Sequence, residues 1–299
     1  MSKPTPRSIA EYLEQLRAAL GNADPALQQD AQYDAEEYLR SEMAEHPEWD
    51  EETMLAHVAT RYGAPEEVAE IYRDQETKVE NALRAPPAPP RRSVWARFFG
   101  VMADPLAYSS LFYLLLSLAT GIFYFTWAVT GISLSAGLAV LIIGVPFAVF
   151  FVSTVRALAL VEGRLVEVML GVRMPRRPLY ADRGRPFGTR IKNMFTDPRT
   201  WSTLLYMVLK LPLGIVYFTL MTIGLSFSIA LAVSPITKAT IGIGLINVND
   251  MVIAPPLWAL PLTLPLGVVC LCATLHVARG IGGLQGQLAK HFLVKSAQY

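Results

Sequence analysis

Long apolar runs alternate with polar stretches over the last two thirds of the chain. Residues 106–160 carry a single charge, Arg156. Because about 20 apolar residues cross a bilayer as a helix, this run predicts two spans joined by a short outer turn at 130–135. Further apolar runs at 201–232 and 257–278 predict a third and a fourth span.

The first 80 residues follow a different pattern, with apolar positions spaced for one face of a helix. Ser8 and Asp24 stand at helix-start positions, and Gly21 and Gly63 at helix ends. The pattern predicts about four short amphipathic helices packed as a bundle, with apolar faces that include Ile9, Leu13, Leu16, Leu20, Leu27, Leu39, Leu55, Val58, Val68 and Ile71.

Composition agrees with a membrane protein, since 53% of the residues are hydrophobic, 17% are charged and the mean hydropathy is +0.35. Residues 1–80 carry 19 Asp and Glu against 7 Lys and Arg, so the rest of the chain is basic. The start of the chain has no apolar run of the secretory type, which predicts that this acidic part stays in the cytoplasm. An acidic surface also argues against direct nucleic-acid binding.

Basic residues gather between the second and third spans. Residues 164–199 hold nine Lys and Arg, whereas the outer segments 130–135 and 234–256 hold only Lys238 and Asp250. The positive-inside rule therefore predicts a multi-pass protein of the bacterial cytoplasmic (inner) membrane with both termini in the cytoplasm.

A proline-rich stretch at 85–90 predicts an extended spacer. Aromatic and basic residues at 95–102 then suit the headgroup layer. The expected organisation is an acidic helical domain at 1–82, a linker at 83–96 and a membrane domain at 97–299.

The membrane domain contains an internal repeat. A shift of 93 residues aligns 104–135 with 197–228 and gives 15 identities in 32 positions, too many for apolar composition alone. Both copies start on the same side, so we expect two parallel two-helix repeats, at 97–172 and 190–293, related by an axis along the membrane normal. Each copy opens with Asp-Pro, where Asp104 and Asp197 are expected to cap the following helix.

The second repeat carries about 26 extra residues, which read as outer strands or loop near 236–256. This segment is either a contact for an external signal or a structural cover over the hairpins, and both alternatives stay open. The fold class is all-α: a cytoplasmic helical bundle plus a four-span helical membrane domain, with a small extracytoplasmic β segment allowed in this insertion.

The segments Tyr12-Leu13-Glu14-Gln15-Leu16, Ala35-Glu36-Glu37-Tyr38-Leu39 and 61–72, with its Tyr-Gly-Ala-Pro-Glu-Glu turn, resemble the HAAS family of signalling-associated helical domains. The resemblance covers about residues 8–75. It implies a cytoplasmic protein-interaction module, with a PadR-like regulator as one class of partner. The turn at Gly63, Pro65, Glu66 and Glu67 is the named candidate for partner binding, although a plain helix–turn–helix joint accounts for it equally simply.

The patterns Asp-Pro-x-x-Tyr/Trp-x-x-Leu-x-Tyr, Leu-Gly-Ile-Val-Tyr-Phe and 156–162 resemble a sensor-type membrane domain of actinobacterial proteins. The resemblance covers about residues 97–293. In those relatives a histidine kinase often follows, whereas this sequence contains no nucleotide-binding glycine loop or phosphoacceptor region.

Lys210 is the strongest candidate for a functional residue inside a span, since an ammonium in lipid is costly. Snorkelling of its charge to the headgroups is the competing account. Pro212 frees a backbone carbonyl nearby. Four tyrosines recur at equivalent depths and either line a pocket for an amphiphile or simply pack: Tyr113, Tyr206, Tyr124 and Tyr217.

No catalytic motif, metal-ligand cluster or cofactor-binding loop is found in the sequence, so we expect a non-enzymatic protein with no catalytic, metal or cofactor residues. The leading hypothesis is a membrane sensor that passes a membrane or envelope signal to a cytoplasmic protein partner. The alternative is an oligomeric membrane scaffold that recruits partners without switching, with close helix contacts at the glycines of 280–286. A small transporter is a third, weaker hypothesis. Expected partners are the lipid bilayer, a cytoplasmic protein and a second copy of the chain.

Overall fold

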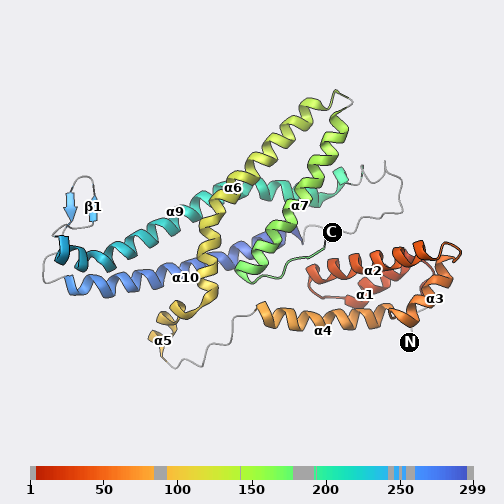
Figure 1. Cartoon of the computed structure of the whole chain (residues 1–299), viewed down its shortest axis with the longest axis horizontal. Helices are drawn as coiled ribbons and strands as arrows, with labels where there is room; N and C mark the ends of the chain where they lie inside the picture. Colours follow the sequence, from red (N-terminus) through yellow and green to blue (C-terminus); the bar gives the residue numbers. More distant parts are fainter. Residues whose placement is uncertain are drawn as a thin grey trace. The chain divides into compact units, whose positions relative to one another are not determined.

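A computed structural model describes residues 5–83, 93–141, 143–177, 192, 194–241, 246–248, 251–253 and 260–294. The expected spacer at 85–90 and much of the basic connection, 178–191, lie outside these residues. The chain divides into two compact units. Unit 1 contains residues 1–84, 133–204 and 288–299, and unit 2 contains residues 85–132 and 205–287. Figure 1 shows the order of the elements along the chain.

The N-terminal part of unit 1 is a four-helix bundle. Its helices are α1 (Ile9–Leu20), α2 (Pro25–Glu45), α3 (Glu51–Arg61) and α4 (Pro65–Leu83). Ser8 Oγ accepts a hydrogen bond from Glu11 N–H and Asp24 Oδ1 accepts one from Ala26 N–H, so both predicted caps are formed. The helices bury one apolar core, which includes Tyr12, Leu16, Leu20, Leu27, Leu39, Met54, Leu55, Val58 and Val68.

The rest of unit 1 comes from the membrane-type helices. It holds α7 (Gly144–Leu170), an irregular segment from Gly171 to Arg177, and the first turns of α9 (Pro198–Ile241). It also holds the last turn of α10 (Leu260–Leu293). Arg199 Nε of α9 donates to the Leu293 carbonyl of α10 at 2.8 Å, so these two helix ends are tied together.

Unit 2 contains α5 (Val94–Phe99), the 3₁₀ turn η1 (Gly100–Ala103), most of α6 (Pro105–Leu138) and the long central parts of α9 and α10. Trp95 is 69% exposed, as an aromatic residue of a headgroup-layer helix would be. The strands β1 (Ile246–Val248) and β2 (Met251–Ile253) pair antiparallel within the insertion.

The helices α9 and α10 run antiparallel and pack through small residues (Figure 1). A Cβ added at Gly224 would lie 2.8 Å from Thr274 Oγ1, and one at Gly267 would lie 2.6 Å from the Ala232 nitrogen. Such close approach needs glycine, as at many helix contacts inside membranes.

The helices α6 and α9 also cross at glycines. A Cβ at Gly121 would lie 2.8 Å from the Lys210 carbonyl oxygen, and one at Gly214 would lie 2.4 Å from the Ser117 carbonyl oxygen. Gly121 and Gly214 are equivalent under the 93-residue shift, and so are Ser117 and Lys210. The crossing therefore uses the same two positions of each sequence copy, in reciprocal contact.

Four helices of the described residues are long and apolar enough to cross a membrane: Pro105–Leu138, Gly144–Leu170, Pro198–Lys238 and Leu260–Leu293. The chain is thus a multi-pass membrane protein of all-α class, as the apolar runs predicted. The two-copy architecture and the boundaries of the predicted domains stay predictions.

The predicted turn at 130–135 is wrong, and the outer strands or loop expected near 236–256 are found only in part, as β1 and β2. Residues 130–135 are helical and belong to α6, which ends at Leu138, so the chain turns only from residue 139 on. Residues 234–241 are likewise helical and extend α9 beyond the expected end of its span. Ser, Thr and Gly read as breakers in water, but within an apolar helix their hydroxyls bond to the preceding turn, as Ser234 Oγ does to the Leu231 carbonyl.

Candidate functional site

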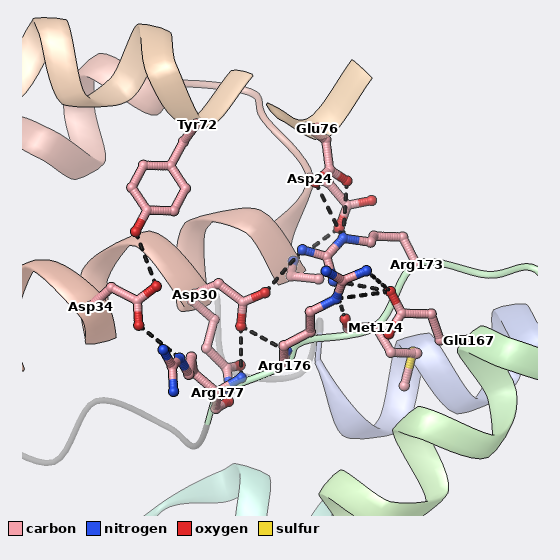
Figure 2. A network of polar contacts seen from close by, with 12 residues as sticks. Asp24, Asp30, Asp34, Tyr72, Glu76, Glu167, Arg173, Met174, Arg176 and Arg177 are labelled. Atoms are coloured by element: carbon pink, nitrogen blue, oxygen red, sulfur yellow. Dashed lines mark hydrogen bonds and ion pairs between the residues drawn. The ribbon is translucent and has the colours of Figure 1, made fainter. Parts of the chain in front are cut away.

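The first half of α2 meets the irregular segment that follows α7. Acidic side chains from the bundle and basic side chains from this segment form a network within unit 1 (Figure 2). We call this network the charge cluster, and its members are Asp30, Asp34, Glu76, Glu167, Arg173, Arg176 and Arg177.

Arg173 is the centre of the charge cluster. Its Nη2 donates to Asp30 Oδ2 at 2.9 Å, and its Nε donates to the Glu76 oxygens at 3.1 and 3.2 Å. Its Nη1 donates to Glu167 Oε1 at 3.3 Å. One guanidinium thus joins α2, α4 and the end of α7, and its side chain is only 11% exposed.

Asp30 receives more than the guanidinium. Its Oδ1 accepts the backbone N–H groups of Arg176 and Arg177, both at 2.7 Å. Asp30 therefore binds the main chain of the segment as well as one of its side chains, which fixes the path of the backbone at this point.

Arg177 makes a second, more exposed contact with α2. Its Nε lies 2.7 Å from Asp34 Oδ1, and its guanidinium carbon lies 5.8 Å from the centre of the Tyr33 ring. Tyr72 of α4 donates from its hydroxyl to Asp34 Oδ2 at 3.0 Å and so orients that carboxylate. The Arg177 side chain is 50% exposed, so this pair is worth less than the Arg173 contacts.

The same helix reaches two further segments of unit 1. Arg199 at the start of α9 donates from Nη2 to Gln29 Oε1 at 2.7 Å. Lys290 near the end of α10 pairs with Asp24. These contacts join α2 to the start of α9 and to the end of α10. The charge cluster joins α2 to the segment that follows α7.

The pKa of Asp30 is determined mainly by burial. Desolvation raises the Asp30 pKa, even though Arg173 and the two backbone N–H donors act to lower it. At Arg173, burial alone would lower the pKa, but the carboxylates of Glu76 and Asp30 outweigh it and raise the pKa. Part of the Coulomb attraction therefore offsets lost hydration, and the net stabilisation is smaller than the number of contacts suggests.

A second polar cluster lies inside unit 2, around Lys210. This side chain has no exposed area, and its Nζ donates to the Tyr113 hydroxyl of α6 at 2.6 Å. Tyr206 lies one turn before it, with the hydroxyl 3.5 Å from Nζ. Gln285 of α10 donates to the Tyr206 hydroxyl at 3.1 Å and accepts from the Tyr217 hydroxyl at 3.0 Å. The Lys210 ammonium is thus held among side chains of three helices.

The structure brings together only part of the predicted membrane site. Lys210, Tyr113, Tyr206 and Tyr217 meet, while buried Tyr124 lies about 16 Å further along α6 than Tyr113. Pro212 is exposed on α9, and the helix continues through it.

The two Asp-Pro pairs form caps and also pair across the hairpins. Asp104 Oδ1 accepts from Leu106 N–H and Asp197 Oδ1 from Arg199 N–H. Asp104, before α6, pairs with Arg279 of α10 in unit 2, and Asp197, before α9, pairs with Arg156 of α7 in unit 1. In both copies the aspartate that caps one hairpin therefore binds an arginine of the other hairpin.

The turn at Gly63 has structural contacts of its own. Gly63 has a φ of +109°, and its carbonyl accepts from the Tyr12 hydroxyl at 2.9 Å. Pro65 and Glu66 open α4. In the same turn Glu67 Oε2 accepts a hydrogen bond from Ala64 N–H and so caps the start of this helix. The contacts of this turn lie within the bundle. The charge cluster, which includes side chains of α2 and α4, was not predicted from the sequence.

The charge cluster can hold or release a segment, but it offers no arrangement for bond chemistry. Its basic groups are guanidiniums, which act only as hydrogen-bond donors, and its carboxylates pair with them. Among the residues that the structure describes, no group of three or more His, Cys, Asp or Glu is placed to hold a metal ion.

The fold and these two clusters define a class: a multi-pass helical membrane protein whose N-terminal helical bundle is held by ion pairs to segments next to its long apolar helices. Residues 113–293 match the family model "Sensor: Putative sensor", and because the match covers more than half of the chain, the chain belongs to this sensor family. No curated protein and no solved structure matches it. The matched range contains Arg173, Glu167 and Lys210, whereas Asp30, Asp34 and Glu76 of the charge cluster lie before it.

Replacement of Arg173 by alanine should release α2 from the segment after α7. The change leaves Asp30 and Glu167 buried without their shared cation, which costs about 3–5 kcal/mol for a pair of this kind. We expect the amide hydrogens of α2 to exchange roughly a hundredfold faster or more in the detergent-solubilised chain.

Arg164→Ala is the matched control. Arg164 also pairs with Glu167, at 3.1 Å, but its side chain is 52% exposed, and this pair lies within α7. Its loss should change exchange in α2 by less than about fivefold. Equal exchange in both variants would show that Arg173 does not hold the bundle.

Substitutions at Lys210 and Tyr113 should show that the buried ammonium lowers the thermal stability of the chain. We expect Lys210→Met to leave the thermal stability of the solubilised chain equal or higher, because a burial cost of about 2.5–3.5 kcal/mol for the ammonium is removed. Tyr113→Phe should lower stability by about 1–3 kcal/mol, because the buried ammonium loses its shortest hydrogen bond. In the Lys210→Met background Tyr113→Phe should have little effect, and equal losses in both backgrounds would contradict the coupling.

Proposed function

We propose that this chain is a non-enzymatic membrane sensor whose membrane domain controls the availability of its soluble bundle to a cytoplasmic protein. The observation that carries the proposal is the position of Arg173, which binds Glu167 of a membrane-type helix and Asp30 of the bundle at once. Membership of the sensor family supports the sensing part of this function.

The charge cluster is suited to transmission because its geometry is demanding. Arg173 reaches its carboxylates only while the end of α7 and the face formed by α2 and α4 keep their present spacing. A rotation or shift of α7 by one or two ångströms breaks hydrogen bonds that leave buried charges behind, so a small movement has a large energetic effect.

The same contacts support an orientation in the membrane. The bundle touches the segment after α7, the start of α9 and the end of α10, which a four-span topology puts on one side. The positive-inside rule assigns this side to the cytoplasm of a bacterial inner membrane. The bundle then works in the cytoplasm, in line with its resemblance to the HAAS domains, and a PadR-like regulator is one candidate partner.

An oligomeric scaffold is the second candidate function. Gly280 and Gly283 leave open space on α10, where a Cβ would meet no atom within 4 Å. Small residues on an exposed membrane helix suit close contact with a further helix, including that of a second copy. A scaffold differs from a sensor in one respect: its partner binding does not depend on the charge cluster.

Affinity capture from native cells tests the two functions against each other. Four detergent-solubilised baits are compared: the wild-type chain, the Arg173→Ala variant, the Arg164→Ala control and a chain without residues 1–82. The sensor proposal predicts a cytoplasmic protein that Arg173→Ala captures at least several-fold better than wild type and that is lost with the bundle. Equal capture by wild type, Arg173→Ala and the Arg164→Ala control would contradict switching and favour the scaffold.

A further inference from the structure

The segment after α7 contacts the bundle in the manner of a bound peptide. Residues 171–177 read Gly-Val-Arg-Met-Pro-Arg-Arg and are neither helix nor strand. Pro175 removes one N–H and disfavours helix at the residue before it, which keeps this stretch open for contact along its length.

Main-chain contacts account for part of the recognition. Asp30 Oδ1 accepts two consecutive backbone N–H groups, those of Arg176 and Arg177. Gln29 Nε2 donates to the Arg177 carbonyl at 2.5 Å. Contacts of this kind require an irregular or extended chain and do not depend on which side chains it carries.

Side-chain contacts add a preference for arginine at two separated positions. The Arg173 guanidinium lies between Asp30 and Glu76, and the Arg177 guanidinium pairs with Asp34 beside the Tyr33 ring. Arginine suits both places better than lysine, because its planar fork meets two carboxylates at once and stacks on aromatic rings.

The segment leaves part of this face unfilled. A cavity of about 310 Å³ lies beside it, bounded on the bundle side by Leu27, Tyr72, Gln75 and Val79 and on the other side by the arginines. Beside Leu27 and Val79 the cavity has room for a larger side chain than those of the segment. The face is thus complementary to the segment in charge without being filled by it.

We propose that the face of α2 and α4 around Asp30, Asp34 and Glu76 is a receptor for an extended, basic peptide of the Arg-x-x-x-Arg type in the protein partner. In this structure the chain's own residues 173–177 occupy the receptor as an internal competitor. This inference deepens the proposed function by naming the chemistry of the partner.

A basic peptide fits this face, and phosphate-bearing ligands do not. With the segment removed, the face presents the three carboxylates of Asp30, Asp34 and Glu76, which repel nucleic acid and anionic headgroups. An internal ligand has an effective concentration of the order of millimolar, so a partner peptide with micromolar affinity competes only weakly until the segment withdraws.

Peptide binding to the full-length, detergent-solubilised chain tests this receptor. A fluorescent peptide with the sequence of residues 171–177 is titrated onto wild type and onto an Arg173→Ala/Arg176→Ala/Arg177→Ala variant, in which the internal competitor is disabled. Anisotropy should give at least tenfold tighter binding to the triple variant than to wild type. A scrambled peptide of the same composition controls for charge alone.

Receptor variants complete the test in the triple-variant background. Asp30→Ala should abolish binding, and Glu76→Gln, a milder change at an 18% exposed side chain, should weaken it several-fold if Asp30→Ala fails to fold. The proposal is overturned if the scrambled peptide binds equally well, or if the triple variant fails to bind the peptide at millimolar concentration. A failure here with switching still seen in the capture experiment would reject the receptor and leave the sensor function intact.

Discussion

One guanidinium, that of Arg173, pairs with three buried or nearly buried carboxylates and links the bundle to α7. Arg173 satisfies Glu167 at the end of a membrane-type helix while it satisfies Asp30 and Glu76 of the bundle. Removing charges from water is costly, and only a complete set of partners offsets that cost. The contact is therefore favourable only while all partners are in place, and the proposed sensor function uses this property.

In unit 2 a buried charge is likewise accommodated only because polar side chains surround it. Lys210 is tolerated because Tyr113 and Tyr206 receive its ammonium, and Gln285 continues the network to α10. Gly121 and Gly214 bring α6 and α9 close enough for these side chains to meet. The polar cluster and the glycine crossing therefore stabilise one arrangement of three helices, whose rearrangement requires a buried charge to find new partners.

Local features of this fold were predictable from sequence, and distant contacts were not. Ser8, Asp24 and Gly21 marked real helix ends because caps depend on neighbouring residues. Residues 130–135 were misread as a turn because Thr, Ser and Gly break helices in water but not inside an apolar span. The opposed charges of the two halves were visible, but the pairing of Asp30 with Arg173, 143 residues apart, is set by tertiary packing that a periodicity cannot reveal.

The most direct measurement is the distance between the bundle and α7 in lipid nanodiscs, from spin labels at Ser41→Cys and Val168→Cys with Cys270 and Cys272 replaced by alanine. Both label sites lie in described helices, and Val168 is 76% exposed. We predict a short and a long distance whose proportions change with bilayer thickness and anionic lipid content, and only the long distance in Arg173→Ala. One unchanging distance in every bilayer, shared by wild type and Arg173→Ala, would contradict transmission through Arg173.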